Sequence, residues 1–231
     1  TQGTLGFTIL DALDDALAAT GTRRPVAAIV TRTLVDRDDP GFTHPTKPIG
    51  RYLSHAQAQP MLDHGQVWQD RGEKGWRRVV ASPEPLEVLD VPALLTLLEA
   101  GHVVVAAGGG GIPVVRDPAG RLRGVEAVTD KDLTAALLAR TIDADVLVIA
   151  TDVDHAAVDW GTPTQRDLGR VTVSQLRAHA ADGQFASGSM GPKVDAAIRF
   201  VAGGGPRSVI TSLTHITDAV EGSFGTVVDP D

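Results

Sequence analysis

Apolar runs alternate with segments of helical periodicity along most of the chain. Residues 1–20 carry apolar side chains at helical spacing and end at Gly21, which predicts a helix. Runs typical of strands occupy 25–35, 102–107, 121–128, 145–150, 208–211 and 225–228. Segments typical of helices occupy 91–100, 131–141, 173–181, 192–202 and 214–221. Strands that alternate with helices predict a doubly wound α/β fold.

Helix starts are marked by side chains that can accept from free backbone N–H groups. Asp90, with Pro92 behind it, is expected to cap the helix over 91–100, and Asp130 the helix over 131–141. Thr172 and Gln175 have the spacing of a capping box. In the helix after Asp130, Leu133, Leu137 and Leu138 are expected to face the core.

Residues 36–85 differ from the rest of the chain. They hold six of the 14 prolines and two of the three tryptophans, and their periodicity is weak. Only 67–68 and 77–81 resemble short hairpin strands. We interpret 36–82 as a protruding insert or lid, and an irregular surface excursion is the alternative.

A glycine run follows the apolar residues 102–107. His102 and the five small or β-branched residues after it predict a strand buried on both faces, and Gly108–Gly111 stand at its carboxyl end. Glycines there leave N–H groups open to an anion, at the edge of the sheet where ligands bind. The run is not a Rossmann loop, because Pro113 stands where a third glycine is needed, and the chain has no Walker A triplet. A flexible turn is the alternative.

A second candidate site is the segment from Gly188 to Lys193. Ser189, Met190 and Gly191 lead into a helix whose first turn holds Lys193, and a helix start beside a lysine suits a phosphate. An ordinary capped helix is the alternative. A first-turn lysine opposes the helix dipole, so an unpaired Lys193 is expected to contribute little to folding.

Two further clusters follow predicted strands. Asp130, Lys131 and Asp132 could orient cations around a transferring phosphoryl group, although a solvated helix start is the alternative. Thr151, Asp152 and Val153, with Trp160 downstream, could hold a nucleotide base. A capped turn with a packed tryptophan explains the same pattern.

The composition of the chain argues against two classes of binding partner. The net charge of −8 and pI near 5.3 argue against nucleic acid or an anionic membrane. No apolar run approaches the ~20 residues of a membrane helix. The chain has no cysteine, which fits a cytoplasmic setting. No metal-binding cluster of side chains is assigned.

Basic residues are biased towards arginine. Only Lys47, Lys74, Lys131 and Lys193 are lysines among 21 basic residues. Where arginine supplies generic charge, a lysine is a candidate for chemistry that needs a compact ammonium. Lys74 is the exception, since it lies in an exposed-looking turn of the insert.

Taken together, the motifs resemble the carbamate kinases of the amino-acid-kinase superfamily. The matching segments, in family order, are 45–50, 106–114, 124–128 with 130–132, 151–154 and 188–193. The resemblance implies a three-layer αβα sandwich with a mainly parallel sheet, formed by one domain over 1–231 with a protruding subdomain at 36–82. It also implies a homodimer and reversible phosphoryl transfer between carbamoyl phosphate and ADP, giving ATP and carbamate, with Mg²⁺.

The resemblance assigns roles by position. It implies that Lys47, Lys131 and Lys193 surround the phosphoryl group and that Asp132 orients the lysines. Gly108, Gly109, Gly110, Gly111 and Asp130 would hold carbamoyl phosphate. The residues implied around the nucleotide are Thr151, Asp152, Val153, Trp160, Ser189, Met190, Gly191 and Lys193. Trp160 replaces the usual tyrosine and keeps a stacking face.

The start of the chain departs from the family. Thr1-Gln2-Gly3 matches a Ser-Gln-Gly pattern, whereas the preceding Gly-Gly-Asn and Gly-Asn-Gly segments have no counterpart. We therefore expect that an N-terminal part is lacking. Two hypotheses follow: a carbamate kinase that is active when complete, or a non-catalytic nucleotide-binding or structural remnant. An amino-acid kinase for a larger acid is a third.

Overall fold

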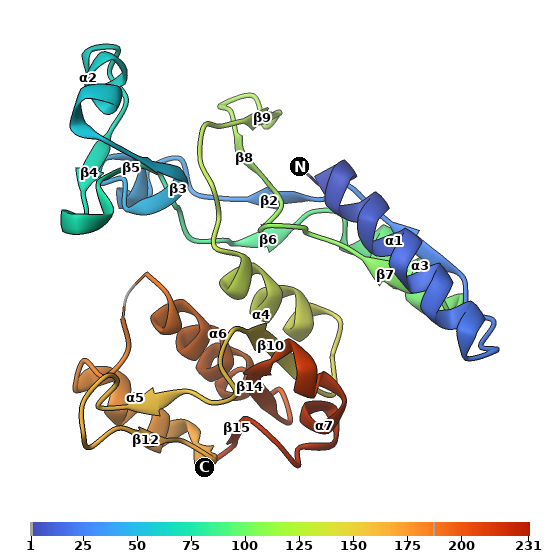
Figure 1. Cartoon of the computed structure of the whole chain (residues 1–231). Helices are drawn as coiled ribbons and strands as arrows, with labels where there is room; N and C mark the ends of the chain where they lie inside the picture. The colour runs from blue at the N-terminus through green and yellow to red at the C-terminus, as the bar shows by residue number, and fades with distance from the viewer. Residues whose placement is uncertain (1, 187) are drawn as a thin grey trace.

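The structure, a computed structural model, describes residues 2–186 and 188–231. Thr1 of the first motif and Ser187, beside the second candidate site, lie outside the described residues. Within this part the chain is α/β, with helices and several small sheets (Figure 1). None of the described helices is long and apolar enough to cross a membrane.

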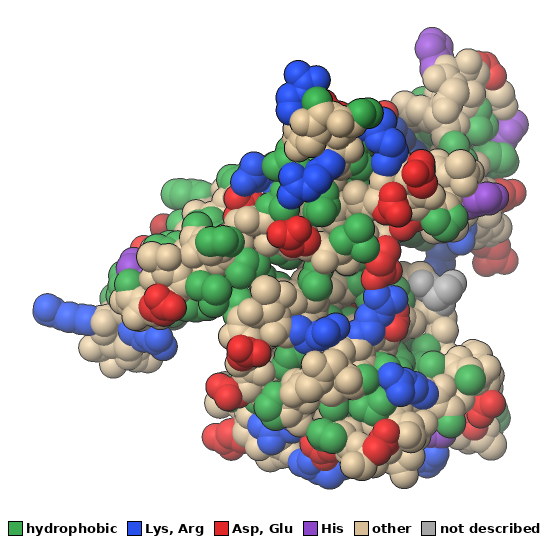
Figure 2. Space-filling view, turned by 180° about the vertical axis from the view of Figure 1, so that it is seen from behind, with side chains coloured by type: hydrophobic (Ala, Val, Ile, Leu, Met, Phe, Trp, Pro, Cys, Tyr) green, Lys and Arg blue, Asp and Glu red, His purple; other side chains and the backbone are tan. Residues whose placement is uncertain are grey.

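The N-terminal helix and the first strand form an arm. Helix α1 (Gln2–Ala19) packs on β1 (Val26–Ala28), which pairs in parallel with β7 (Val103–Val105), and α3 (Val91–Glu99) packs on β7. The helical pattern of α1 is confirmed, but Gly6 is its only buried residue among those described. Figure 2 shows hydrophobic side chains spread over this arm, and Phe7 is 70% exposed.

The middle of the molecule is a four-stranded sheet. Its order is β6 (Glu87–Val88), β2 (Arg32–Leu34), β8 (Ile112–Arg116) and β9 (Leu122–Gly124). β2 and β8 are parallel, whereas the other neighbours are antiparallel. The strand before the glycine loop, β7, and the strand after it, β8, therefore belong to different sheets.

The insert has its own sheet and helix, and it stands away from the rest of the molecule (Figure 1). β3 (Lys47–Leu53), β5 (Trp76–Val80) and β4 (Trp68–Asp70) form an antiparallel sheet beside α2 (His55–Asp63). Short 3₁₀ turns lie at Pro40–Phe42 and Gly72–Lys74. β3 and α2 were not expected, because Pro48 and Pro60 lie inside them.

The C-terminal half contains the main core. Its sheet has the order β10 (Leu147–Thr151), β14 (Ser208–Ser212), β15 (Thr226–Asp229) and β13 (Arg170–Thr172). Its helices are α4 (Lys131–Thr141), α5 (Val173–Ala181), α6 (Met190–Ala202) and α7 (Ile216–Glu221). The remaining elements are the hairpin β11 (Ala157–Val158) and β12 (Arg166–Asp167), and a 3₁₀ turn at Leu213–His215.

Strand alternation places helices on both faces of this sheet. Leu147, Ile149 and Ile210 pack in one cluster with α4, α5 and α6. Val148 and Val209, which point the other way, pack against Ala219 of α7. The period-2 pattern of buried strands thus supports a helix–sheet–helix arrangement in this half.

Several local predictions need correction. The run 25–35 is not one strand: it breaks after β1, and β2 joins another sheet. The run 102–107 forms only β7, whose residues are half-buried because, within the described residues, β1 is its only partner strand. The described C-terminal sheet is mixed, since the antiparallel pair β14–β15 lies beside the parallel pairs β10–β14 and β13–β15.

Two helix predictions also changed in detail. The Asp90 carboxylate does not cap α3 and instead accepts from the Arg32 backbone N–H at 2.7 Å and from its guanidinium at 2.7 Å. In α4 the leucines are half-buried, whereas the fully buried positions include Asp132 and Thr134. Polar side chains are therefore packed at the very start of α4.

Candidate active site

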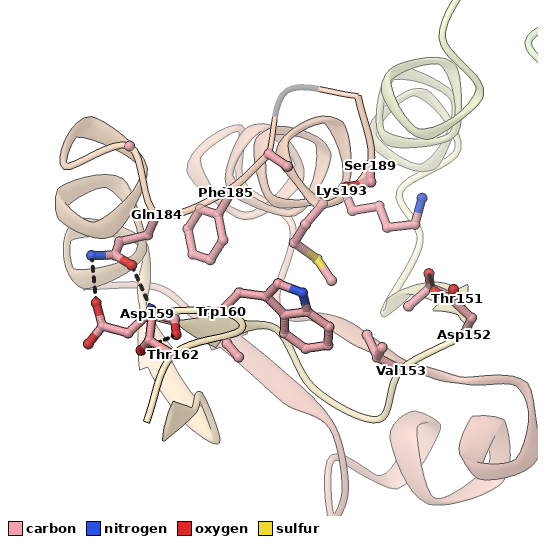
Figure 3. Close-up of a pocket in the computed structure, with 14 residues that line it drawn as sticks. Thr151, Asp152, Val153, Asp159, Trp160, Thr162, Gln184, Phe185, Ser189 and Lys193 are labelled. Atoms are coloured by element: carbon pink, nitrogen blue, oxygen red, sulfur yellow. Dashed lines mark hydrogen bonds between the residues drawn. The ribbon is translucent and has the colours of Figure 1, made fainter. Parts of the chain in front are cut away.

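A pocket of about 710 Å³ opens where β10 ends (Figure 3). Thr151, Asp152 and Val153 stand at one end of it, while Asp159, Thr162 and Gln184 stand at the other. The Trp160 indole lies between these ends, and Lys193 and Ser189 line the same cavity from α6. The fold thus brings the turn at 151–153 beside the segment that begins at Gln184, more than 30 positions later in the chain.

Most residues predicted to surround a nucleotide line this pocket. They are Thr151, Asp152, Val153, Trp160, Ser189, Met190 and Lys193. Gly191 does not, and it lines the neighbouring cleft instead. The segment from Gly188 to Lys193 contains the start of α6, but the Ser189 side chain makes no hydrogen bond that caps this helix.

Other pocket residues were missed from the sequence. The Gln184 side chain accepts from the Asp159 N–H at 2.7 Å, and Phe185 completes the apolar wall. Asp159 has a left-handed backbone with φ of 53°. No periodicity marks these residues, because they follow short turns whose mutual approach depends on the fold.

Lys47 and Asp130 form an ion pair between the insert and α4. The Asp130 carboxylate caps α4 by accepting from the N–H groups of Asp132 at 2.8 Å and Leu133 at 3.2 Å. Its second oxygen accepts from Lys47, the first residue of β3. The predicted cap is confirmed, and it also anchors the insert beside the core.

Asp132 lies between Lys131 and Lys193. Its Oδ2 lies 3.1 Å from Lys193 Nζ and 3.5 Å from Lys131 Nζ. The side chains of Asp132 and Lys193 are 9% and 11% exposed. The expectation of an unpaired Lys193 was therefore wrong, because α4 supplies a buried carboxylate that faces the first turn of α6.

A second cleft, of about 1100 Å³, lies between the insert and the starts of α4 and α6. Lys47, Asp130 and Lys131 line it, and Ser189 belongs to both cavities. The insert adds further groups that the sequence did not single out: Tyr52, Arg71, Lys74 and Arg77. Lys74 is exposed in its turn, as predicted, and it also lines this cleft.

The glycine loop is only partly open. Gly108 and Gly109 are exposed, whereas Gly110 is buried with φ of 119°. A Cβ at Gly110 would lie 2.6 Å from the Thr129 carbonyl, and one at Gly111 would lie 2.0 Å from Thr33 Oγ1. These two glycines are therefore required by close packing and by backbone conformation.

Hydrogen bonds within the loop limit its role as an anion cradle. The N–H of Gly108 donates to Ala106, and those of Gly110 and Gly111 donate to Ala107. Of the four loop glycines, only Gly109 has an N–H that donates to no acceptor among the described residues. Gly108 lines an apolar groove beside α1, and none of the four glycines lines the two cavities above.

The environment of Asp130 lowers its pKa. Burial would raise the pKa of this carboxyl, but the hydrogen bond and charge of Lys47, with the amides of Leu133 and Asp132, more than offset it. A carboxyl with a depressed pKa stabilises the fold above its unfolded-state pKa, and this is lost as the pH falls through the folded value.

Asp130→Asn is therefore expected to lower the melting temperature at pH 6. Asparagine keeps the cap and removes the ion pair, so the difference from wild type should shrink as the pH falls below about 4. Thermal unfolding between pH 6 and pH 2 measures this. Asp14→Asn, on an exposed position of α1, is the control. A difference that stays constant to pH 2 would contradict the assignment.

Known proteins match this chain in sequence and in fold. The Amino acid kinase family model matches residues 28–212. A carbamate kinase of Thermococcus kodakarensis is 46% identical over 99% of this chain and 72% of its own length. The carbamate kinase-like protein YahI of Escherichia coli is 44% identical over 98% of this chain and 72% of its own length. The structure of Giardia lamblia carbamate kinase bound to AMP-PNP has a TM-score of 0.90 at 40% identity, over all of this chain and 73% of that one. The chain therefore belongs to the amino acid kinase family, and within it to the carbamate kinases.

Proposed function

We propose that this protein catalyses reversible phosphoryl transfer between carbamoyl phosphate and ADP. The observation that carries the proposal is the junction of the two cavities at the start of α6. Ser189 lines both, and Lys193 reaches from the pocket to Asp132 at 3.1 Å. The phosphate end of a nucleotide in the pocket would therefore lie beside Lys193, with Lys47 and Lys131 in the adjoining cleft.

The nucleotide is assigned to the pocket. Trp160 offers an aromatic face to the base in the middle of the pocket, and Thr151, Asp152 and Lys193 lie towards one end for the phosphates. In the solved Giardia lamblia relative the bound molecule is AMP-PNP, an ATP analogue, which supports a nucleotide ligand here.

Transfer needs charge stabilisation rather than a general base. A terminal oxygen of ADP attacks phosphorus, the bond from phosphorus to the carbamate oxygen breaks, and carbamate leaves with that electron pair. Lys47, Lys131 and Lys193 would stabilise the charge on the phosphoryl oxygens. Asp130 and Asp132 would hold these ammonium groups in place before substrate arrives.

Mg²⁺ is proposed as the partner of the nucleotide. Among the described residues, no group of three or more carboxylates and histidines forms a metal cage. We expect the ion to come with the phosphates and to keep part of its water, and Asp152 is a pocket carboxylate at the end assigned to the phosphates. When bound, the ion would neutralise phosphate charge.

ATP formation tests the proposal. We expect the protein to make ATP from ADP and carbamoyl phosphate, measured with a coupled luminescent assay and a panel of acyl phosphates. Preference for the acyl phosphate of a larger acid would leave a kinase but reject the carbamate assignment.

A second candidate is nucleotide binding without transfer. The glycine loop favours it, because three of its four N–H groups in the described part are already used internally. Calorimetric binding of ADP with no ATP from any acyl phosphate would support this candidate.

Four broader points remain proposals. The helices on both faces of the C-terminal sheet support the three-layer αβα sandwich. The single domain with a lid at 36–82 is supported by the separate sheet of the insert. The homodimer and the cytoplasmic setting rest on the resemblance and on the composition, and sedimentation velocity would measure the oligomer.

A further inference from the structure

Three buried threonine hydroxyls converge on one backbone carbonyl. The Gly110 oxygen lies 2.8 Å from Thr33 Oγ1, 2.5 Å from Thr129 Oγ1 and 3.2 Å from Thr134 Oγ1. Each of these threonines is at most 1% exposed. A carbonyl has two lone pairs, so this one is more than saturated by donors.

The three hydroxyls come from different parts of the fold. Thr33 lies on β2, Thr129 lies just before the cap of α4, and Thr134 lies in α4. Thr134 also reaches the Asp130 carbonyl at 2.9 Å. Its single hydrogen is shared, so Thr33 and Thr129 are the donors committed to Gly110 alone.

The three threonines connect the glycine loop to the start of α4, where Asp130 and Asp132 pair with lysines. The residue after Thr129 is Asp130, which pairs with Lys47, and Asp132 pairs with Lys193. On the other side, the N–H groups of Gly110 and Gly111 close the loop onto the Ala107 carbonyl. Fixing Gly110 therefore fixes the exposed tip at Gly108 and Gly109.

We propose that Thr33, Thr129 and Thr134 are positioning residues for phosphoryl transfer. The three threonines hold the Gly110 carbonyl and so fix the position of the Gly108–Gly109 tip, with its open Gly109 N–H. The tip then keeps a constant position relative to the lysines that pair with Asp130 and Asp132. The tip then presents one backbone donor to the acyl phosphate at a fixed distance from those cations. The inference rests on the proposed function, because it assigns the acyl phosphate to this tip.

The test is the Thr33→Val, Thr129→Val double variant of the whole protein. Valine keeps the branched shape and removes the hydroxyl, so the loop loses its committed donors. We expect KM for carbamoyl phosphate to rise about tenfold, the effect of one lost net hydrogen bond. KM for ADP and the calorimetric affinity for ADP should stay as in wild type. The corresponding double serine variant keeps both hydroxyls and should restore KM.

Ser208→Ala is the matched control. Its hydroxyl is also fully buried and donates to a carbonyl, that of Leu147 at 3.1 Å, but it lies where β10 and β14 begin, at the opposite edge of their sheet from the pocket. It should lower thermal stability without changing KM for carbamoyl phosphate. If the double variant does not fold, the single Thr129→Val variant carries the same expectation with a smaller rise.

The outcomes are distinguishable. An unchanged KM for carbamoyl phosphate, or an equal rise of both KM values, would overturn the positioning role while wild type stays active. Wild type that forms no ATP from carbamoyl phosphate would overturn the proposed function and this inference with it.

Discussion

Lys193→Met is expected to lower turnover by about 10²- to 10³-fold, the scale of losing one preorganised donor to a transition-state anion. The reason is the position of Lys193, which lines the nucleotide pocket and is held by Asp132 at 3.1 Å. Methionine keeps most of the stem, so the change removes mainly charge. The coupled ATP assay at saturating substrates measures this effect.

The same substitution is expected to destabilise the protein. It leaves the buried Asp132 carboxylate with Lys131 alone, at 3.5 Å and more exposed to solvent. A charged hydrogen bond of this kind contributes about 1.5–3 kcal/mol. For a chain of this size, each kcal/mol shifts the melting temperature by about 2–4 °C. Turnover must therefore be measured well below the melting temperature of the variant.

Arg140→Met is the control for Lys193→Met. Arg140 is an exposed cation in the last turn of α4, at the far end of the helix from Asp132. Its loss should leave turnover intact. Near-normal turnover in Lys193→Met, or an equal loss of turnover in Arg140→Met, would contradict the placement of the phosphoryl group at the start of α6.

Trp160→Ala is expected to weaken ADP binding by about 5- to 150-fold, the range of about 1–3 kcal/mol for losing one base–aromatic stack. Trp160 is 62% exposed although it lines the pocket, so its large aromatic face is open to a ligand. Little packing depends on it, and the melting temperature should hardly change. Calorimetric titration with ADP and Mg²⁺ measures the affinity.

Two variants separate stacking from other effects of the tryptophan. Trp160→Tyr keeps an aromatic face and should bind ADP nearly as wild type does. Trp68→Phe changes a tryptophan in the insert, outside the pocket, and should leave the affinity unchanged. Equal affinity of Trp160→Ala and wild type would place the base elsewhere.

Local chemistry made part of the site predictable from the sequence. Asp130 as a helix cap and Thr172 with Gln175 as a capping box were confirmed, since a cap needs only residues a few positions apart. The arginine bias drew attention to Lys47, Lys131 and Lys193, and the structure places all three beside acidic partners.

Only the tertiary structure decided which of these groups meet. Lys47 and Asp130 are 83 positions apart, and Lys193 and Asp132 are 61 positions apart. Hydrophobic periodicity reports which face of an element is buried, but it does not report which element covers that face. For this reason the sequence identified Lys193 and misjudged it as unpaired, and it found the glycine run without the threonines that hold it. The motifs determined the family and the types of residue in the site, whereas chain packing over long separations determined the pairs, the two cavities and the orientation of the loop.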